Sequence, residues 1–70
     1  MSDHMTRAAV CGKLDGLIAL EETGLNALAD IASSIRDQKF EGGREISLAI
    51  TKLEESLHRL RDARIILEQK

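Results

Sequence analysis

The 70-residue chain is long enough for one small domain and supports only a small hydrophobic core. A formal net charge of −2 argues against a protein that binds DNA or RNA polymers, since such proteins are usually basic. The single cysteine excludes an internal disulfide, which fits a reducing cytoplasm, and neither a signal peptide nor a membrane-spanning apolar run is recognisable. With one Phe and no Trp or Tyr, the core is expected to be aliphatic and marginal without self-association.

The chain begins Met-Ser-Asp-His-Met. We interpret residues 1–4 as an expression remnant, because His-Met is what an NdeI cloning site encodes, and Met5 as the native start. Residues 5–70 are then expected to form a single domain. His4 drops out as a candidate ligand.

Residues 6–38 predict one long helix or two collinear helices, with Thr6 as a plausible N-cap. The glycines at positions 12, 16 and 24 weaken the pattern, and we interpret them as points of close approach between helices. Gly24 could instead mark a kink or a break. One apolar face is formed by residues at steps of three, four or seven: Leu14, Ile18, Leu25, Leu28, Ala32 and Ile35.

A second apolar row runs beside the first on the same helix: Leu17, Leu20, Ala27 and Ile31. Together the two rows make the helix apolar over more than half of its circumference. One partner helix cannot cover so wide a face. In so short a chain the further partner is expected to come from another subunit.

Residues 39–43 predict the turn, with Gly42 and Gly43 suited to a sharp reversal, and residues 44–68 predict the second helix. Its apolar stripe is regular: Ile46, Ile50, Leu53, Leu57 and Leu60. Two long amphipathic helices joined by a short connection predict an all-α antiparallel helical hairpin. We expect the hairpins to assemble into a homo-oligomeric helical bundle.

Two charged residues, Glu21 and Arg64, occupy positions where the stripes expect apolar side chains. Both lie far from the turn in the predicted hairpin, so one interpretation is an ion pair between them that sets the register of an oligomer. The other is that these layers are wet and both side chains reach outward to water.

A catalytic site is not predicted. Cys11 and His58 are the only plausible nucleophile and base, and no third residue is evident to orient them. Cys11 is expected to be a small buried apolar residue and His58 to face solvent. One cysteine and one native histidine do not make a metal site, and no cofactor motif is present.

The polar face at the start of the second helix is the candidate binding site. Arg44, Ser47 and Thr51 lie at helical spacing, Lys52 lies beside them, and the free backbone N–H groups of the first turn favour an anion. Donors of this kind suit phosphate groups. The alternative interpretation is an ordinary solvated surface.

Residues 44–56, Arg-Glu-Ile-Ser-Leu-Ala-Ile-Thr-Lys-Leu-Glu-Glu-Ser, resemble the second-helix signature of the small phage anti-CBASS sponges. They are similar to a helical hairpin domain shared with Thoeris-blocking phage sponges. The resemblance implies an all-α homo-oligomer, commonly a hexamer, that sequesters cyclic oligonucleotide immune messengers without cleaving them. Its pockets would lie between subunits, and Arg44 and Thr51 match the family by position.

The first helix departs from that family, whose members carry a Gly-Tyr-Arg-like stretch with an aromatic ring that stacks on a base. This chain has no Tyr, so stacking is expected from arginine planes or aliphatic side chains. The predicted function is sequestration of a cyclic di- or trinucleotide in the cytoplasm of an infected bacterial host. The alternative is a small helical adaptor or inhibitor that binds a protein through its apolar faces.

Overall fold

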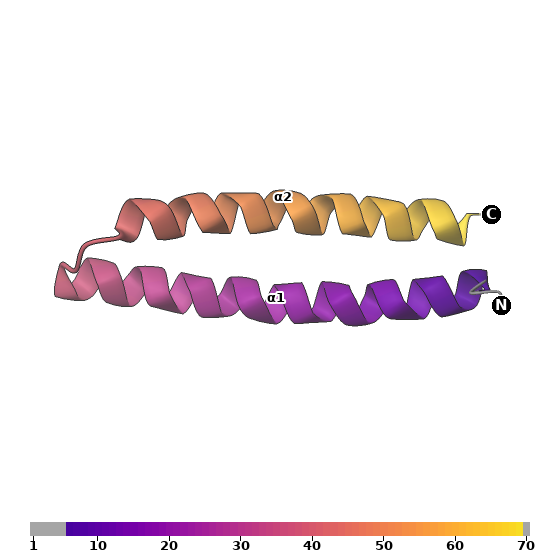
Figure 1. Cartoon of the computed structure of the whole chain (residues 1–70), viewed down its shortest axis with the longest axis horizontal. Coiled ribbons are helices and arrows are strands. Elements are labelled where there is room, and N and C mark those ends of the chain that lie inside the picture. Colours follow the sequence, from indigo (N-terminus) through magenta and orange to yellow (C-terminus); the bar gives the residue numbers. More distant parts are fainter. Residues whose placement is uncertain (1–5, 70) are drawn as a thin grey trace, which may run out of the picture.

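The computed structural model describes residues 6–69, which form two helices, α1 (Arg7–Gln38) and α2 (Gly43–Glu68). The helices run antiparallel and side by side (Figure 1), and both ends far from the turn lie together. The predicted all-α helical hairpin is therefore confirmed. Residues 1–4, interpreted above as an expression remnant, lie outside the described residues. Within residues 6–69 neither helix combines the length and hydrophobicity needed to cross a membrane.

The helix α1 is continuous over 32 residues and begins at a well-formed cap. The Thr6 hydroxyl accepts a hydrogen bond from the Ala9 backbone N–H at 3.1 Å, which satisfies a donor that would otherwise lack a helical partner. The prediction that Thr6 is the N-cap is confirmed. Gly24 lies inside the continuous helix, so the alternative of two collinear helices with a break at that position is wrong.

The turn is made by two residues with left-handed backbone conformation, Lys39 (φ 57°) and Gly42 (φ 102°). Behind Lys39, the Phe40 N–H donates to the Ile35 carbonyl at 3.0 Å and the Lys39 N–H donates to Arg36 at 3.3 Å. These two bonds form a Schellman cap, which usually takes Gly where this chain has Lys39. Gly42, which has the second positive φ, is the N-cap of α2. The helix α2 therefore begins at Gly43, one residue earlier than predicted.

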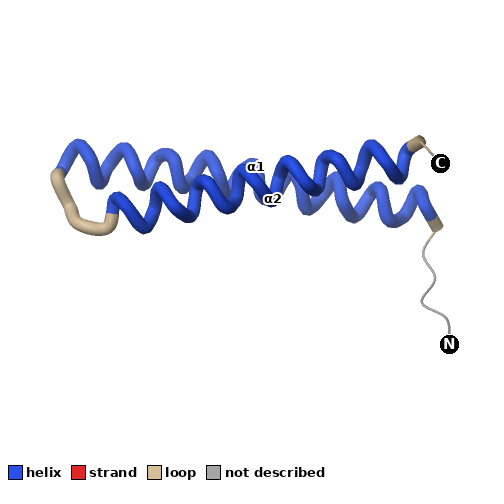
Figure 2. The backbone as a smooth tube through the Cα atoms, turned by 90° about the horizontal axis from the view of Figure 1, so that it is seen from above, coloured by secondary structure: helices blue, strands red, loops and turns tan. Residues whose placement is uncertain are grey.

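The core lies between the two helices, which pack against each other and cross in the view from above in Figure 2. Leu57, at 2% exposure, is the one buried side chain among the described residues. The other residues of both predicted apolar faces are half-buried against each other. The second row of α1 stays in the open, and Leu20 is 68% exposed. The predicted division between a covered and an uncovered apolar row is confirmed for the single chain.

The hairpin has two broad sides of different character. One, which we call the ion-paired side, carries Asp15 with Arg64 and Glu22 with Arg61. The other, which we call the apolar side, carries the exposed row of α1: Leu17, Leu20, Ala27 and Ile31. At about 100° of rotation per residue, Asp15 and Glu22 point away from this row, so the two groups occupy opposite sides.

Of the two interpretations of Glu21 and Arg64, the ion pair between them is wrong. Arg64 binds Asp15, and Glu21 accepts a hydrogen bond from the Ser56 hydroxyl at 3.2 Å. Glu21 is level with Ser56 along the hairpin axis, two helical turns from Arg64. The interpretation of wet layers is also wrong in part, because both side chains are half-buried and engaged.

The glycines of α1 differ in their surroundings. A methyl group added at Gly24 would lie 3.9 Å from a Leu53 methyl carbon, so this glycine does border α2. Gly12 and Gly16 have no approaching atom within 4 Å. The interpretation of close helix approach therefore holds for Gly24 and is wrong for the other two within this chain.

Candidate functional site

The four predicted phosphate-binding residues all lie on the exposed surface of α2, within its first three turns. Arg44, Ser47 and Thr51 follow one another at steps of three and four, so they share one face of the helix. The Thr51 hydroxyl donates to the Ser47 carbonyl at 3.2 Å, which leaves the oxygen lone pairs of Thr51 free and its proton engaged. Lys52 lies about 100° around the helix from Thr51.

A hollow of about 340 Å³ lies at the turn, where the end of α1 meets the start of α2. Ser47 contributes to it from α2, and two cations, Arg36 and Lys39, contribute from the end of α1. Phe40, the chain's one aromatic residue, also lines it and is 60% exposed. The hollow thus combines positive charge, a hydroxyl and an aromatic ring.

The sequence pattern did not predict three of the residues that line this hollow: Arg36, Lys39 and Phe40. Spacing within α2 reveals only the donors that this helix carries itself. The signal that could have found them is the position of a lone aromatic residue next to basic residues at a predicted turn. The Schellman cap then turns this segment back toward the first turn of α2.

A second hollow, of about 570 Å³, lies further along the outer surface of α2. Thr51 forms one end of it, and the rest of its lining is acidic or mixed: Glu54, Glu55, His58, Arg59 and Asp62. His58 is exposed, as predicted, and lies 3.4 Å from Asp62. Three carboxylates against one arginine and one histidine disfavour an anion here.

The predicted four-residue group is therefore divided by the structure. Ser47 joins the basic hollow at the turn, whereas Thr51 joins the acidic one, and Arg44 and Lys52 line neither. Arg44 belongs to the first turn of α2, where backbone N–H groups lack helical partners, although Glu45 adds a carboxylate there. The end of the hairpin near the turn is the part of this face best suited to a phosphate.

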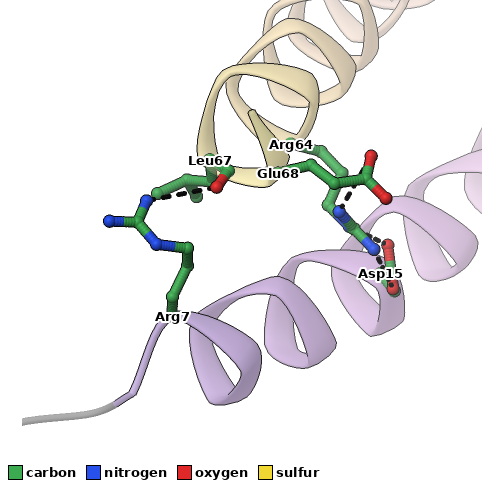
Figure 3. Close-up of polar contacts among 5 residues, drawn as sticks. All are labelled: Arg7, Asp15, Arg64, Leu67 and Glu68. Carbon is green, nitrogen blue, oxygen red and sulfur yellow. Dashed lines mark hydrogen bonds and ion pairs between the residues drawn. The ribbon is translucent and has the colours of Figure 1, made fainter. Parts of the chain in front are cut away.

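The opposite end of the hairpin is closed by polar contacts (Figure 3). Arg64 donates to Asp15 through Nε at 2.8 Å and through Nη2 at 3.3 Å, and its Nη1 lies 3.5 Å from a Glu68 carboxylate oxygen. The hydrogen bond to Asp15 raises the pKa of Arg64. Arg7 reaches across from α1 and donates to the Leu67 carbonyl at 3.1 Å, which caps the end of α2. Arg64 Nη1 is buried and has no hydrogen-bond partner among the described residues, although a Glu68 carboxylate oxygen lies 3.5 Å away.

Chemistry-bearing residues are sparse in the described part of the chain. Cys11 is half-buried, and His58 contacts Asp62. Residues 6–69 contain no group of three or more His, Cys, Asp or Glu residues placed to hold a metal ion. The turn hollow is consequently the strongest candidate for a binding site.

Comparison with protein-family models, with curated proteins and with solved structures finds no match to this chain.

Proposed function

We propose that this chain forms a homo-oligomer that binds and sequesters a cyclic oligonucleotide without cleaving it. The observation that carries the proposal is the resemblance of residues 44–56 to the second helix of the phage sponges, together with the exposure of Arg44 and Ser47 at the end of the hairpin that holds a basic hollow. The protein would act in the cytoplasm of an infected bacterial host. Capture lowers the concentration of free messenger by mass action, so no catalytic group is required.

The chemistry at the turn supports a ligand of this class. Arg44 can hold a phosphate through paired N–H donors, and Arg36 and Lys39 add positive charge nearby. Phe40 offers the flat apolar surface on which a nucleobase stacks, which takes the role expected above of arginine planes or aliphatic side chains. Ser47 adds a hydroxyl donor. Thr51 and Lys52 would serve the same ligand only where it extends along α2.

A subunit boundary is the expected place for the pocket. The hollow is open, and its volume of about 340 Å³ lies at the low end of the roughly 300–1,000 Å³ typical of small-molecule sites. A second subunit over the turn would enlarge and enclose it. Oligomer formation and ligand binding would then be linked, so that ligand stabilises the assembly.

Native mass spectrometry with a panel of cyclic di- and trinucleotides tests the proposal, because it reports stoichiometry and ligand together. Calorimetric titration of the ligand so found then compares Arg44→Ala with Arg59→Ala. Arg59 lies fifteen residues along α2, about 22 Å away, and is a matched control. Charge-assisted hydrogen bonds contribute roughly 1.5–3 kcal/mol, so Arg44→Ala should weaken binding more than about tenfold. Unchanged affinity in Arg44→Ala would move the site elsewhere.

A protein-binding adaptor or inhibitor is the second candidate function. The observation that favours it is the exposed apolar row of α1, which a partner helix could cover. Recovery of one stoichiometric protein partner, together with no binding to any cyclic oligonucleotide, would favour this function over sequestration.

A further inference from the structure

We infer that the hollow at the turn is a subsite for one nucleoside monophosphate unit, and that Lys39 and Gly43 are the residues that adapt it to this ligand. Lys39 and Arg36 hold the phosphate, and the ring of Phe40 stacks on the base. The inference rests on the proposed function in taking nucleotides as the class of ligand. It goes beyond that function in naming the bound unit and two residues that determine specificity.

Lys39 stands where the backbone favours glycine. Its φ of 57° lies in the left-handed region, which is disfavoured for a residue with a Cβ atom and is usual for the glycine of a Schellman cap. A lysine here therefore costs local stability. It also contributes a cation to the lining of the hollow, which a glycine could not do. Residues held in unfavourable backbone conformations cluster at ligand sites, so this exception favours a role in binding.

Gly43 stands where the backbone would accept a side chain. It is the first residue of α2 and has no positive φ. A Cβ atom added there would lie 3.5 Å from a methyl carbon of Ile35, which is an ordinary van der Waals distance, and helices favour Ala over Gly. Neither the backbone nor a neighbour thus demands glycine. Because Gly43 and Ile35 both line the hollow, the missing side chain leaves room for a ligand to approach the backbone.

The charge of the hollow suits an anion that carries an aromatic ring. Its charged side chains are two cations, Arg36 and Lys39, and neither takes part in an ion pair among the described residues. The carboxylates nearest along the chain, Asp37 and Glu41, are not part of the lining. A phosphate satisfies the cations, whereas Phe40 offers a surface to a base. A nucleotide is the ligand that uses both.

The size of the hollow suits one nucleotide unit rather than a whole cyclic oligonucleotide. Its volume of about 340 Å³ lies at the low end of the roughly 300–1,000 Å³ typical of small-molecule sites. Ala32 and Ile35 add apolar surface to that of Phe40. A single aromatic ring and a single pair of cations match one base and one phosphate. The rest of a cyclic oligonucleotide would lie outside the hollow.

NMR titration of the full chain with GMP and AMP, and separately with guanosine and with inorganic phosphate, tests the class of ligand. We expect each nucleotide to shift the amide resonances of Lys39, Phe40 and Gly43. Each nucleotide should bind at least about tenfold more tightly than guanosine or phosphate, since only the nucleotide engages the cations and the ring together. Equal affinity for a nucleotide and for either fragment, or shifts confined to other residues, would overturn the inference.

Lys39→Gly separates the role of this lysine in binding from its effect on the turn. We expect the variant to unfold at a higher urea concentration, because glycine suits the left-handed conformation, and to bind GMP at least about tenfold more weakly, because a charge-assisted contact is lost. Lys13→Ala removes the same charge at an exposed position far from the turn and should not change the affinity. Higher stability of Lys39→Gly without loss of affinity would overturn the inference.

Gly43→Ala tests the room in the wall of the hollow. We expect unchanged helical circular dichroism and at least about fivefold weaker binding of GMP, because the methyl group occupies space that the ligand needs. Gly12→Ala, whose added methyl group meets no atom within 4 Å, is the matched control and should bind as the parent does.

The same variants separate this inference from the proposed function. If a cyclic oligonucleotide binds the parent, Lys39→Gly and Gly43→Ala equally well, the inference fails and the proposed function stands. If GMP binds in a manner that depends on Lys39 and no cyclic oligonucleotide binds, the inference stands and the proposed function fails.

Discussion

The two broad sides of the hairpin are built from the same two helices and differ in whether the side chains of α1 find partners on α2. On the ion-paired side, Asp15 and Glu22 of α1 reach Arg64 and Arg61 of α2, so charged groups across the helix boundary are matched within the chain. On the apolar side, the row of α1 finds no counterpart in α2. One side is complete in the single chain, and the other is not.

This difference separates specificity from stability. The exposed ion pairs join residues that are level with each other in the two helices, although each pair contributes little free energy. Burial of apolar surface supplies most of the stability of a folded chain, yet here only Leu57 is buried among residues 6–69. The ion-paired side is therefore matched to the register of the two helices, and the apolar side retains exposed apolar surface whose burial would add stability.

The largest effect is expected from Leu57→Ala, which removes the buried side chain between α1 and α2. Leu57 is buried between α1 and α2, so its truncation leaves a cavity as well as removing apolar contact. We expect a loss of about 2–5 kcal/mol in the free energy of unfolding, measured by urea denaturation. Leu48→Ala, at an exposed position of the same helix, is the control and should cost well under half of that.

The next effect is expected from Arg64→Gln, which breaks the ion-paired side alone. The Arg64 side chain is 25% exposed, so the loss should be smaller than for Leu57→Ala and should shrink further in 1 M salt, where charges are strongly screened. Arg59→Gln, for which the described residues show no ion pair, should change the urea midpoint little at either salt concentration. A loss for Arg64→Gln that does not respond to salt would show that packing of its stem matters more than its charge.

The pH dependence of the same variant sharpens the assignment. The hydrogen bond to Asp15 raises the pKa of Arg64, so the cation is favoured in the folded chain. A cation whose pKa is higher in the folded chain stabilises the fold at every pH below its unfolded pKa. This stabilisation is lost only as the pH rises through its folded pKa. The difference in urea midpoint between the parent and Arg64→Gln should therefore stay constant from pH 7 to pH 9 (values chosen well below the arginine range).

The smallest effect is expected from Gly12→Ala, which tests whether a glycine that lies away from the contact between α1 and α2 is needed. A methyl group at this position meets no atom within 4 Å, so only the backbone is affected. Replacement of glycine inside a helix stabilises by about 0.4–1 kcal/mol, chiefly by restricting the unfolded chain. A higher urea midpoint would support this, whereas a lower one would place Gly12 in a contact with another subunit.

Much of the fold follows from local pattern. The apolar periodicity, Thr6 and the glycine pair at 42–43 predicted both helices to within about one residue of their observed ends. The exposed row of α1 was predicted as well, because a helix that is apolar over more than half of its circumference cannot be covered by one neighbour. These features depend on residues close in sequence, so helical geometry alone converts them into a surface.

The tertiary structure alone decided which residues meet across the hairpin. An ion pair between Arg64 and Glu21 was one of two interpretations of the sequence, and Arg64 instead binds Asp15, because the relative register of two helices depends on the path of the turn. That path includes a left-handed Lys39, a conformation that sequence patterns assign to glycine. The same turn brings Arg36 and Phe40 beside Ser47 and separates Ser47 from the acidic hollow at Thr51. Periodicity gives the face on which a residue lies, whereas its neighbours across the helix boundary depend on how far one helix is displaced along the other.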